Sequence, residues 1–133
     1  VVLHFARQLK ETGELNLFEG SGGFAAGEQR RDFVFVDDVV NVNLWLMQHP
    51  DVSGVFNVGT GKSASFNELA HAVINRIGRG DIRYIAFPDG LRDSYQSFTE
   101  ADITALRNAG YSQTFIDVAA GVRMYLDRTN GAP

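Results

Sequence analysis

The sequence predicts an α/β fold in which helices alternate with strands that pair largely in parallel. Segments with apolar residues at helical spacing alternate with short runs rich in β-forming residues, and glycine or proline ends most of these segments. In addition, 44% of the 133 residues are hydrophobic, which is enough to build one sizeable core. Length and composition therefore favour one folded region over two domains or a disordered chain.

Helices are expected where apolar residues recur every three or four positions. The clearest case follows Ser65, which stands three residues before Glu68 in the spacing of a capping box. Asp37 or Asp38 is expected to cap the helix that begins near Val39, and Thr99 is expected to cap the helix that extends to about Leu106. The expected helices cover about Val1–Lys10, Val39–Met47, Phe66–Ile77, Thr99–Leu106 and Thr114–Asp127.

Strands are expected in short runs rich in β-branched and aromatic residues. Leu15–Phe18 alternates as a half-buried strand does, whereas Phe33–Val36 and Val52–Val58 are apolar enough to predict strands covered on both faces. Ile82–Phe87 is a fourth expected strand, before a Pro-Asp-Gly turn. The four glycines of Gly20–Gln29 predict a long loop, a kind of segment that often carries ligands.

Charge and residue inventory restrict the chemistry. Sixteen acidic and twelve basic side chains give a net charge of −4, so no general attraction to nucleic acid or membranes is expected, and an anionic ligand must be held locally. The absence of cysteine excludes disulfides and thiolate chemistry. Only Glu68 and His71 have metal-ligand spacing, so no metal site is expected. No membrane span or secretory signal is found, and a cytoplasmic location is expected.

The segment Gly59–Ser63 lies between an expected strand and an expected helix, where phosphate-binding loops occur. Its register fails, because that loop needs a glycine at position 56, which is Phe56. We interpret it as a tight turn, with a P-loop NTPase as the weaker alternative. Neither a G-x-G-x-x-G fingerprint nor a Tyr with Lys four residues later is present, so the chain is not expected to bind a nicotinamide cofactor alone in the usual way.

Three polar side chains have two possible roles each, a binding role and a structural role. Arg31 follows the glycine-rich loop and its planar guanidinium suits a phosphate, but a surface ion pair with Asp32 or Glu28 is equally expected. Tyr95 lies in a polar stretch where it can meet a ligand or stay half-buried. For His4, beside apolar residues on the first helix, a partly buried structural role is favoured.

Motifs over nearly the whole chain resemble one known group of enzymes. Arg31–Val39 followed by Gly54–Gly61 resembles the C-terminal portion of extended short-chain dehydrogenase/reductases that act on nucleotide sugars, in the NAD-dependent epimerase/dehydratase superfamily. More narrowly, Leu17–Ser21, Val42–Leu46 and Tyr84–Thr99 are similar to the ADP-L-glycero-D-manno-heptose 6-epimerase family.

This resemblance implies that residues 1–133 are the C-terminal substrate-binding portion of a Rossmann-type enzyme. The Rossmann domain, with its NADP fingerprint and catalytic Tyr and Lys, would precede this chain, and residues 52–78 would contribute to the edge of that domain. The implied reaction is NADP-dependent epimerisation at C6 of an ADP-heptose, which supplies the lipopolysaccharide core. This chain alone is therefore expected to be inactive.

The resemblance also implies a role for particular residues. Arg31 would pair with the diphosphate of ADP, the segment that begins at Phe18 would line the nucleotide pocket, and Tyr95 would hydrogen-bond a phosphate or sugar oxygen. The implied substrate-binding residues are His4, Phe18, Glu19, Gly20, Ser21, Arg31 and Tyr95; no catalytic, cofactor-binding or metal-binding residue is expected.

The implied partners are the ADP-sugar, the chain's own N-terminal Rossmann domain and further copies of the enzyme, with no nucleic acid and no membrane. Two alternatives remain open at this point. One is another nucleotide-sugar epimerase or dehydratase of the same superfamily, because the general motifs would look the same. The other is an independent ligand-binding or interaction module.

Overall fold

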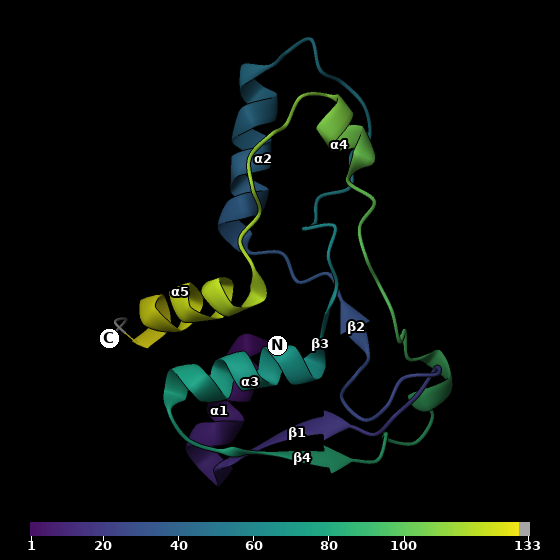
Figure 1. The fold of residues 1–133 in the computed structure, drawn as a ribbon, viewed down its shortest axis with the longest axis vertical. Helices are drawn as coiled ribbons and strands as arrows, with labels where there is room; N and C mark the ends of the chain where they lie inside the picture. The colour runs from purple at the N-terminus through teal and green to yellow at the C-terminus, as the bar shows by residue number, and fades with distance from the viewer. Residues whose placement is uncertain (131–133) are drawn as a thin grey trace.

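The computed structural model describes residues 1–130 and confirms the predicted α/β class (Figure 1). The first half contains α1 (Val2–Thr12), β1 (Glu14–Phe18), a long loop, β2 (Arg30–Arg31) and α2 (Val36–Gln48). The second half contains β3 (Ala64–Ser65), α3 (Phe66–Ile77), β4 (Asp81–Ile85), the 3-10 helix η1 (Arg92–Ser94), α4 (Thr104–Asn108) and α5 (Val118–Asn130).

The strands form two small sheets. β1 and β4 pair in parallel, with Glu14 opposite Asp81 and Phe18 opposite Ile85, as the alternation of strands and helices predicts. β2 and β3 pair antiparallel. Because β1 and β4 run in the same direction, their carboxyl ends lie together, next to the long loop and η1 at the lower right of Figure 1.

Two hydrophobic cores hold these elements. The main core joins α1, β1, α3 and α5, and at its centre Leu9, Leu15 and Val73 are fully buried. The second core joins α2 and α4 through Val42 and Leu106 and includes the buried ring of Tyr111. In Figure 1, α2 and α4 stand together at one end of the molecule, apart from the layer formed by α1, α3 and α5.

Local end signals set the limits of the helices that the sequence predicts best. Ser65 and Glu68 form the expected capping box: the Glu68 amide donates to Ser65 Oγ (3.1 Å), and the Ser65 amide donates to Glu68 Oε2 (2.6 Å). α1 ends at Gly13, whose φ of 76° places it in the left-handed region that suits glycine. Both helices are therefore confirmed.

Two expected strands are wrong. Phe33–Phe35 pairs with no strand of the described residues and Val36 already begins α2, while residues 52–58 contain no strand. Val55 in that segment is 95% exposed. Apolar content predicts burial, but a strand also needs a partner with free hydrogen-bonding groups, and residues 1–130 supply none at these positions.

The expected caps of α2 are also wrong, because neither aspartate bonds to its first amides. The N-cap is Phe35, without a side-chain bond. The buried Asp38 carboxylate accepts the Ile116 amide (2.8 Å), and Asp37 forms an ion pair with Arg128 (2.6 Å), which lowers the pKa of Asp37 chiefly through their hydrogen bond. The two carboxylates that were expected to cap α2 thus bond to residues that are distant in the sequence, Ile116 and Arg128.

The last two helices start later than predicted. Thr99 caps no helix, since its amide donates to the Arg30 carbonyl oxygen (3.1 Å) and α4 covers only Thr104–Asn108. α5 begins at Val118 instead of position 114, directly after Asp117, whose Oδ1 accepts the Ala120 amide (2.7 Å). In both places a connection to another segment replaces the first expected turn.

Candidate functional site

Arg31, at the end of β2, lies beside aromatic rings. Its Cζ is 5.3 Å from the ring centroid of Tyr95 and 5.9 Å from that of Phe66. One guanidinium nitrogen donates to the Arg30 carbonyl oxygen (2.8 Å). The alternative of a surface ion pair with Asp32 or Glu28 is not realised, because the ion pairs of residues 1–130 do not include Arg31.

Instead of pairing with Arg31, the carboxylate of Asp32 accepts hydrogen bonds from other segments of the chain. It accepts the Thr60 amide (2.8 Å), the Thr60 hydroxyl (2.6 Å), the Gly61 amide (2.9 Å) and the Ala101 amide (3.1 Å). A Cβ at Gly59 would approach Asp32 Oδ2 to 2.7 Å, so this approach requires glycine. The turn 59–61 is therefore wrapped around Asp32.

This geometry contradicts the alternative that Gly59–Ser63 is a phosphate-binding P-loop. A phosphate-binding loop needs free amides at the start of the helix. Here the amides of Thr60 and Gly61 are already bonded to Asp32, and the Ser63 amide donates to Glu100 Oε2 (2.8 Å). The turn is structural, as its failed register indicates.

Three aromatic rings form a cluster at the carboxyl ends of β1 and β4. Phe18 and Phe87 stack at 4.5 Å between centroids, and the Tyr95 ring meets Phe87 at 5.0 Å and Phe18 at 5.7 Å. All three side chains are half-buried. Burial raises the pKa of Tyr95, and the guanidinium of Arg31 acts in the opposite direction, so the phenol stays a neutral donor at physiological pH.

The segment Glu19–Ser21 leads from this cluster into the long loop. The Glu19 carboxylate accepts from Arg92 of η1 (3.0 Å), and the Gly20 carbonyl oxygen accepts from the same guanidinium (3.4 Å). Ser21 Oγ lies 3.1 Å from Ser97 Oγ. Six of the seven predicted site residues, all except His4, thus lie in this one region.

His4 is separate from that region. It lies in the first turn of α1 and is exposed, so the partly buried structural role is wrong. In Figure 1 the start of α1, near the N-terminus, lies well away from η1 at the lower right. Within residues 1–130, no hydrogen bond or ring contact joins His4 to the cluster.

Sequence reasoning missed four members of the region, one of which is the buried Gln29. Phe87, Arg92 and Ser97 contact Phe18, Glu19 and Ser21, respectively. The parallel pairing of β1 with β4 is the signal for Phe87, because it brings the residues that follow both strands to one edge. Arg92 and Ser97 lie within the segment Tyr84–Thr99 that carries the family resemblance, but no local pattern singles them out from the other residues of that segment.

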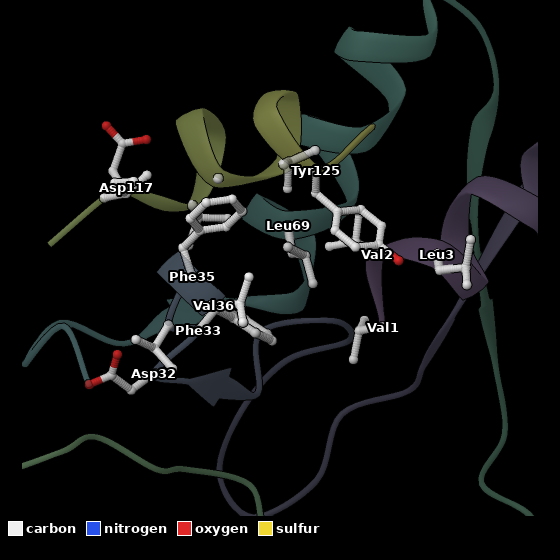
Figure 2. Close-up of a pocket in the computed structure, with 15 residues that line it drawn as sticks. Val1, Val2, Leu3, Asp32, Phe33, Phe35, Val36, Leu69, Asp117 and Tyr125 are labelled. Carbon is white, nitrogen blue, oxygen red and sulfur yellow. The ribbon is translucent and has the colours of Figure 1, made fainter. Parts of the chain in front are cut away.

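A separate pocket of about 440 Å³ opens between the start of α1, the unpaired segment 32–36 and α5 (Figure 2). Its walls are mainly valine, leucine and phenylalanine side chains, such as Val2, Phe35 and Leu69. None of the seven predicted site residues lines it. Its lining contains the carboxylates of Asp32 and Asp117 and no basic side chain, which does not suit an anionic ligand.

Two further features bear on the class of site. In the part of the chain that the structure describes, His, Cys, Asp and Glu side chains form no group of three or more that could hold a metal ion. Over the same residues, no helix has the length and apolarity needed to cross a membrane.

Known proteins resemble this chain over almost its whole length. A model of the NAD dependent epimerase/dehydratase family matches residues 1–59. The ADP-L-glycero-D-manno-heptose-6-epimerase of Alkalilimnicola ehrlichii is 56% identical over 100% of this chain and 42% of its own length, and that of Thiobacillus denitrificans is 47% identical over 96% and 43%. The crystal structure of the Helicobacter pylori enzyme of the same name matches with a TM-score of 0.78 and 30% identity, over 98% of this chain and 38% of that chain.

The fold and these matches make the chain similar to proteins of the NAD dependent epimerase/dehydratase family. The similar proteins named above are ADP-L-glycero-D-manno-heptose-6-epimerases, which confirms the resemblance seen in the sequence. It spans about two fifths of the length of the curated relatives that it matches.

The role of Asp32 predicts a large loss of stability in Asp32→Ala. Removing the acceptor leaves three amides and one hydroxyl without their partner, so we expect the free energy of unfolding to fall by about 2–3 kcal/mol. Urea unfolding of the chain measures this loss. Asp51→Ala, at an exposed aspartate, is the control and should change stability by less than about 0.5 kcal/mol. Equal losses in the two variants would contradict the role of Asp32.

Proposed function

We propose that this chain supplies the ADP-sugar contacts of an NADP-dependent epimerase that interconverts ADP-D-glycero-D-manno-heptose and ADP-L-glycero-D-manno-heptose. The observation that carries this proposal is the convergence of Arg31, Tyr95 and the segment that begins at Phe18 at one edge of the structure. The names of the relatives support the choice of substrate.

Arg31 has the properties of a diphosphate-binding residue. Its guanidinium is half-buried, lies over the Tyr95 ring and is not neutralised by a carboxylate of the described chain. This contact leaves guanidinium N–H groups, apart from the one that donates to the Arg30 carbonyl oxygen, available to donate to phosphate oxygens. With a net charge of −4, the protein has no general positive field, so affinity for an anionic substrate rests on such placed groups.

The remaining residues of the region complete a nucleotide pocket. The faces of Phe18 and Phe87 offer apolar area to a base or ribose, while the neutral phenol of Tyr95 donates to a phosphate or sugar oxygen. Glu19 and Gly20 are held by Arg92, and we propose that they border the same pocket. For His4 we propose a contact with the part of the substrate that extends toward α1.

We assign the cofactor chemistry to the rest of the enzyme. NADP would supply the removal and return of hydride at C6, but the residues present here do not fit its pyrophosphate. The glycine turn 59–61, which has the sequence most similar to a phosphate cradle, uses two of its amides to bind Asp32. The catalytic Tyr and Lys are likewise proposed to lie outside this chain, which is then inactive alone.

The exposed face of α2 supports the proposal that the chain docks on a nucleotide-binding domain. Val36, Val40, Leu44 and Met47 recur along one side of α2 and are 48–78% exposed, while the opposite side packs Val42 into the second core. A helix with apolar residues on opposite sides normally lies between two layers. We propose that this face and residues 52–78, including the exposed Val55, meet that domain.

The assignment of chemistry predicts no turnover by this chain. An assay of the purified chain with ADP-D-glycero-D-manno-heptose and NADP should detect no epimer, whereas the longer protein that contains it should form the epimer. Competition between ADP- and UDP-sugars for the longer protein tests the substrate class. Turnover by the chain alone would overturn the assignment, and preference for a UDP-sugar would favour another nucleotide-sugar epimerase.

The role of Arg31 predicts a binding defect in Arg31→Ala. In the longer protein, we expect KM for the ADP-sugar to rise about ten- to a hundredfold, since a charge-assisted contact contributes roughly 1.5–3 kcal/mol. Steady-state kinetics measure the change, and Arg79→Ala, at an exposed arginine, is the control that should leave KM unchanged. An unaltered KM in Arg31→Ala would remove this residue from the site.

The role of the exposed face of α2 predicts that Leu44→Asp acts only in the longer protein. There it should lower the free energy of unfolding by about 1.5–3 kcal/mol, because it places a carboxylate in a buried apolar contact. In this chain alone the same change should alter stability by less than about 0.5 kcal/mol, since Leu44 is exposed. Asn41→Asp, at an exposed polar position of the same helix, is the control. Equal small effects of Leu44→Asp in both proteins would rule out docking through this face.

A further inference from the structure

Gln29 is a buried polar residue at the end of the long loop, and the proposed function gives it no role. Its side chain is 1% exposed. Its amide nitrogen donates to the Glu19 carbonyl oxygen (2.7 Å) and to Ser21 Oγ (3.3 Å). One amide group therefore binds two members of the segment Glu19–Ser21 from the loop's opposite end.

The backbone around Gln29 is fixed from two sides. Its carbonyl oxygen accepts the Phe66 amide (3.1 Å), which ties it to the start of α3. The next residue, Arg30, pairs with β3 and also donates its amide to the Ser97 carbonyl oxygen (2.9 Å). Arg31 follows directly, so the Gln29 side chain and the Arg31 guanidinium extend from the same short stretch of backbone, on either side of Arg30.

The segment Glu19–Ser21 has less support of its own. It lies beyond the end of β1, and Arg92, which also holds it, is an exposed side chain on η1. The Glu19 amide still donates to the Ile85 carbonyl oxygen (2.8 Å), whereas Ser21 forms an isolated β-bridge only with Phe24 of the same loop. The fully buried amide of Gln29 is thus the direct connection between this segment and the residues that carry Arg31, whereas Ser97 makes a second, indirect one through Ser21 Oγ (3.1 Å) and the Arg30 amide (2.9 Å).

We propose that Gln29 is a positioning residue that sets the segment Glu19–Ser21 at a fixed distance from Arg31 and so tightens binding of the ADP-sugar. Gln29 does not touch the substrate. This inference rests on the proposed function, because it assigns both parts to one substrate site. When the amide is absent, the Glu19 carbonyl loses a donor and the segment must be ordered during binding, which weakens affinity.

The test compares two glutamine-to-methionine variants of the longer protein. Gln29→Met keeps a side chain of similar length but removes both donors, and should raise KM for the ADP-sugar and Kd for ADP about three- to tenfold, with kcat within about twofold of wild type. Gln8→Met is the matched control. Gln8 also bonds to backbone through its side-chain amide, accepting the Asn16 amide (3.3 Å), but it lies on α1 and touches neither part of the site.

A second variant separates positioning from general packing. Gln29→Glu keeps the size and shape of the side chain, but at neutral pH its carboxylate has no proton to donate to the Glu19 carbonyl or the Ser21 hydroxyl oxygen. Protonation restores a donor, so the ratio of its KM to the wild-type KM should decrease as pH falls from about 8 toward about 5.5. The same ratio for Gln29→Met should stay constant over that range.

The outcomes separate this inference from the function on which it rests. If wild-type protein neither binds ADP nor turns over ADP-heptose, the proposed function fails and the inference fails with it. In an active enzyme, three results overturn the inference alone: an unchanged KM in Gln29→Met, an equal rise in Gln8→Met, or a Gln29→Glu defect that does not respond to pH. If Gln29→Met does not fold, the pH-dependent ratio of Gln29→Glu decides.

Discussion

The carboxylate of Asp32 is the interaction on which the site depends. It gathers donors from Thr60, Gly61 and Ala101, and so joins three segments that are far apart in the sequence at the end of β2. These bonds have a second consequence. Because the oxygens of Asp32 are committed to these donors, the adjacent guanidinium of Arg31 is not neutralised by its neighbour and extends over the Tyr95 ring instead.

The parts of the fold that could be predicted are those set by nearby residues. The capping box of Ser65 and Glu68 defines the start of α3 within one turn, and Gly13 ends α1 for a similarly local reason. Phe33–Val36 could not be predicted in the same way. Its composition is that of a buried strand, but strand formation depends on a partner edge, and this chain instead uses the segment to line an apolar pocket.

The candidate site shows the same division. Arg31 and Tyr95 could be named as candidates from the sequence by their chemistry, since both follow or lie in segments typical of ligand sites, but only the family resemblance favoured a binding role over a structural one. Their contact could not be predicted, because it depends on how β1 and β4 pair and on the course of the chain through η1. For the same reason Phe87 was missed, although it stacks on Phe18.

These constraints bear on how an acidic chain would hold the anionic substrate proposed for it. Long-range attraction is absent at a net charge of −4, so the affinity has to come from short contacts whose geometry is fixed before the ligand arrives. A flexible arginine on a glycine loop would lose much of that affinity to ordering. Here β2 is fixed through its pairing with β3, and the glycine-containing segment is fixed to it through the buried amide of Gln29. We therefore expect the fixed geometry of these contacts to compensate for the missing charge in the proposed site.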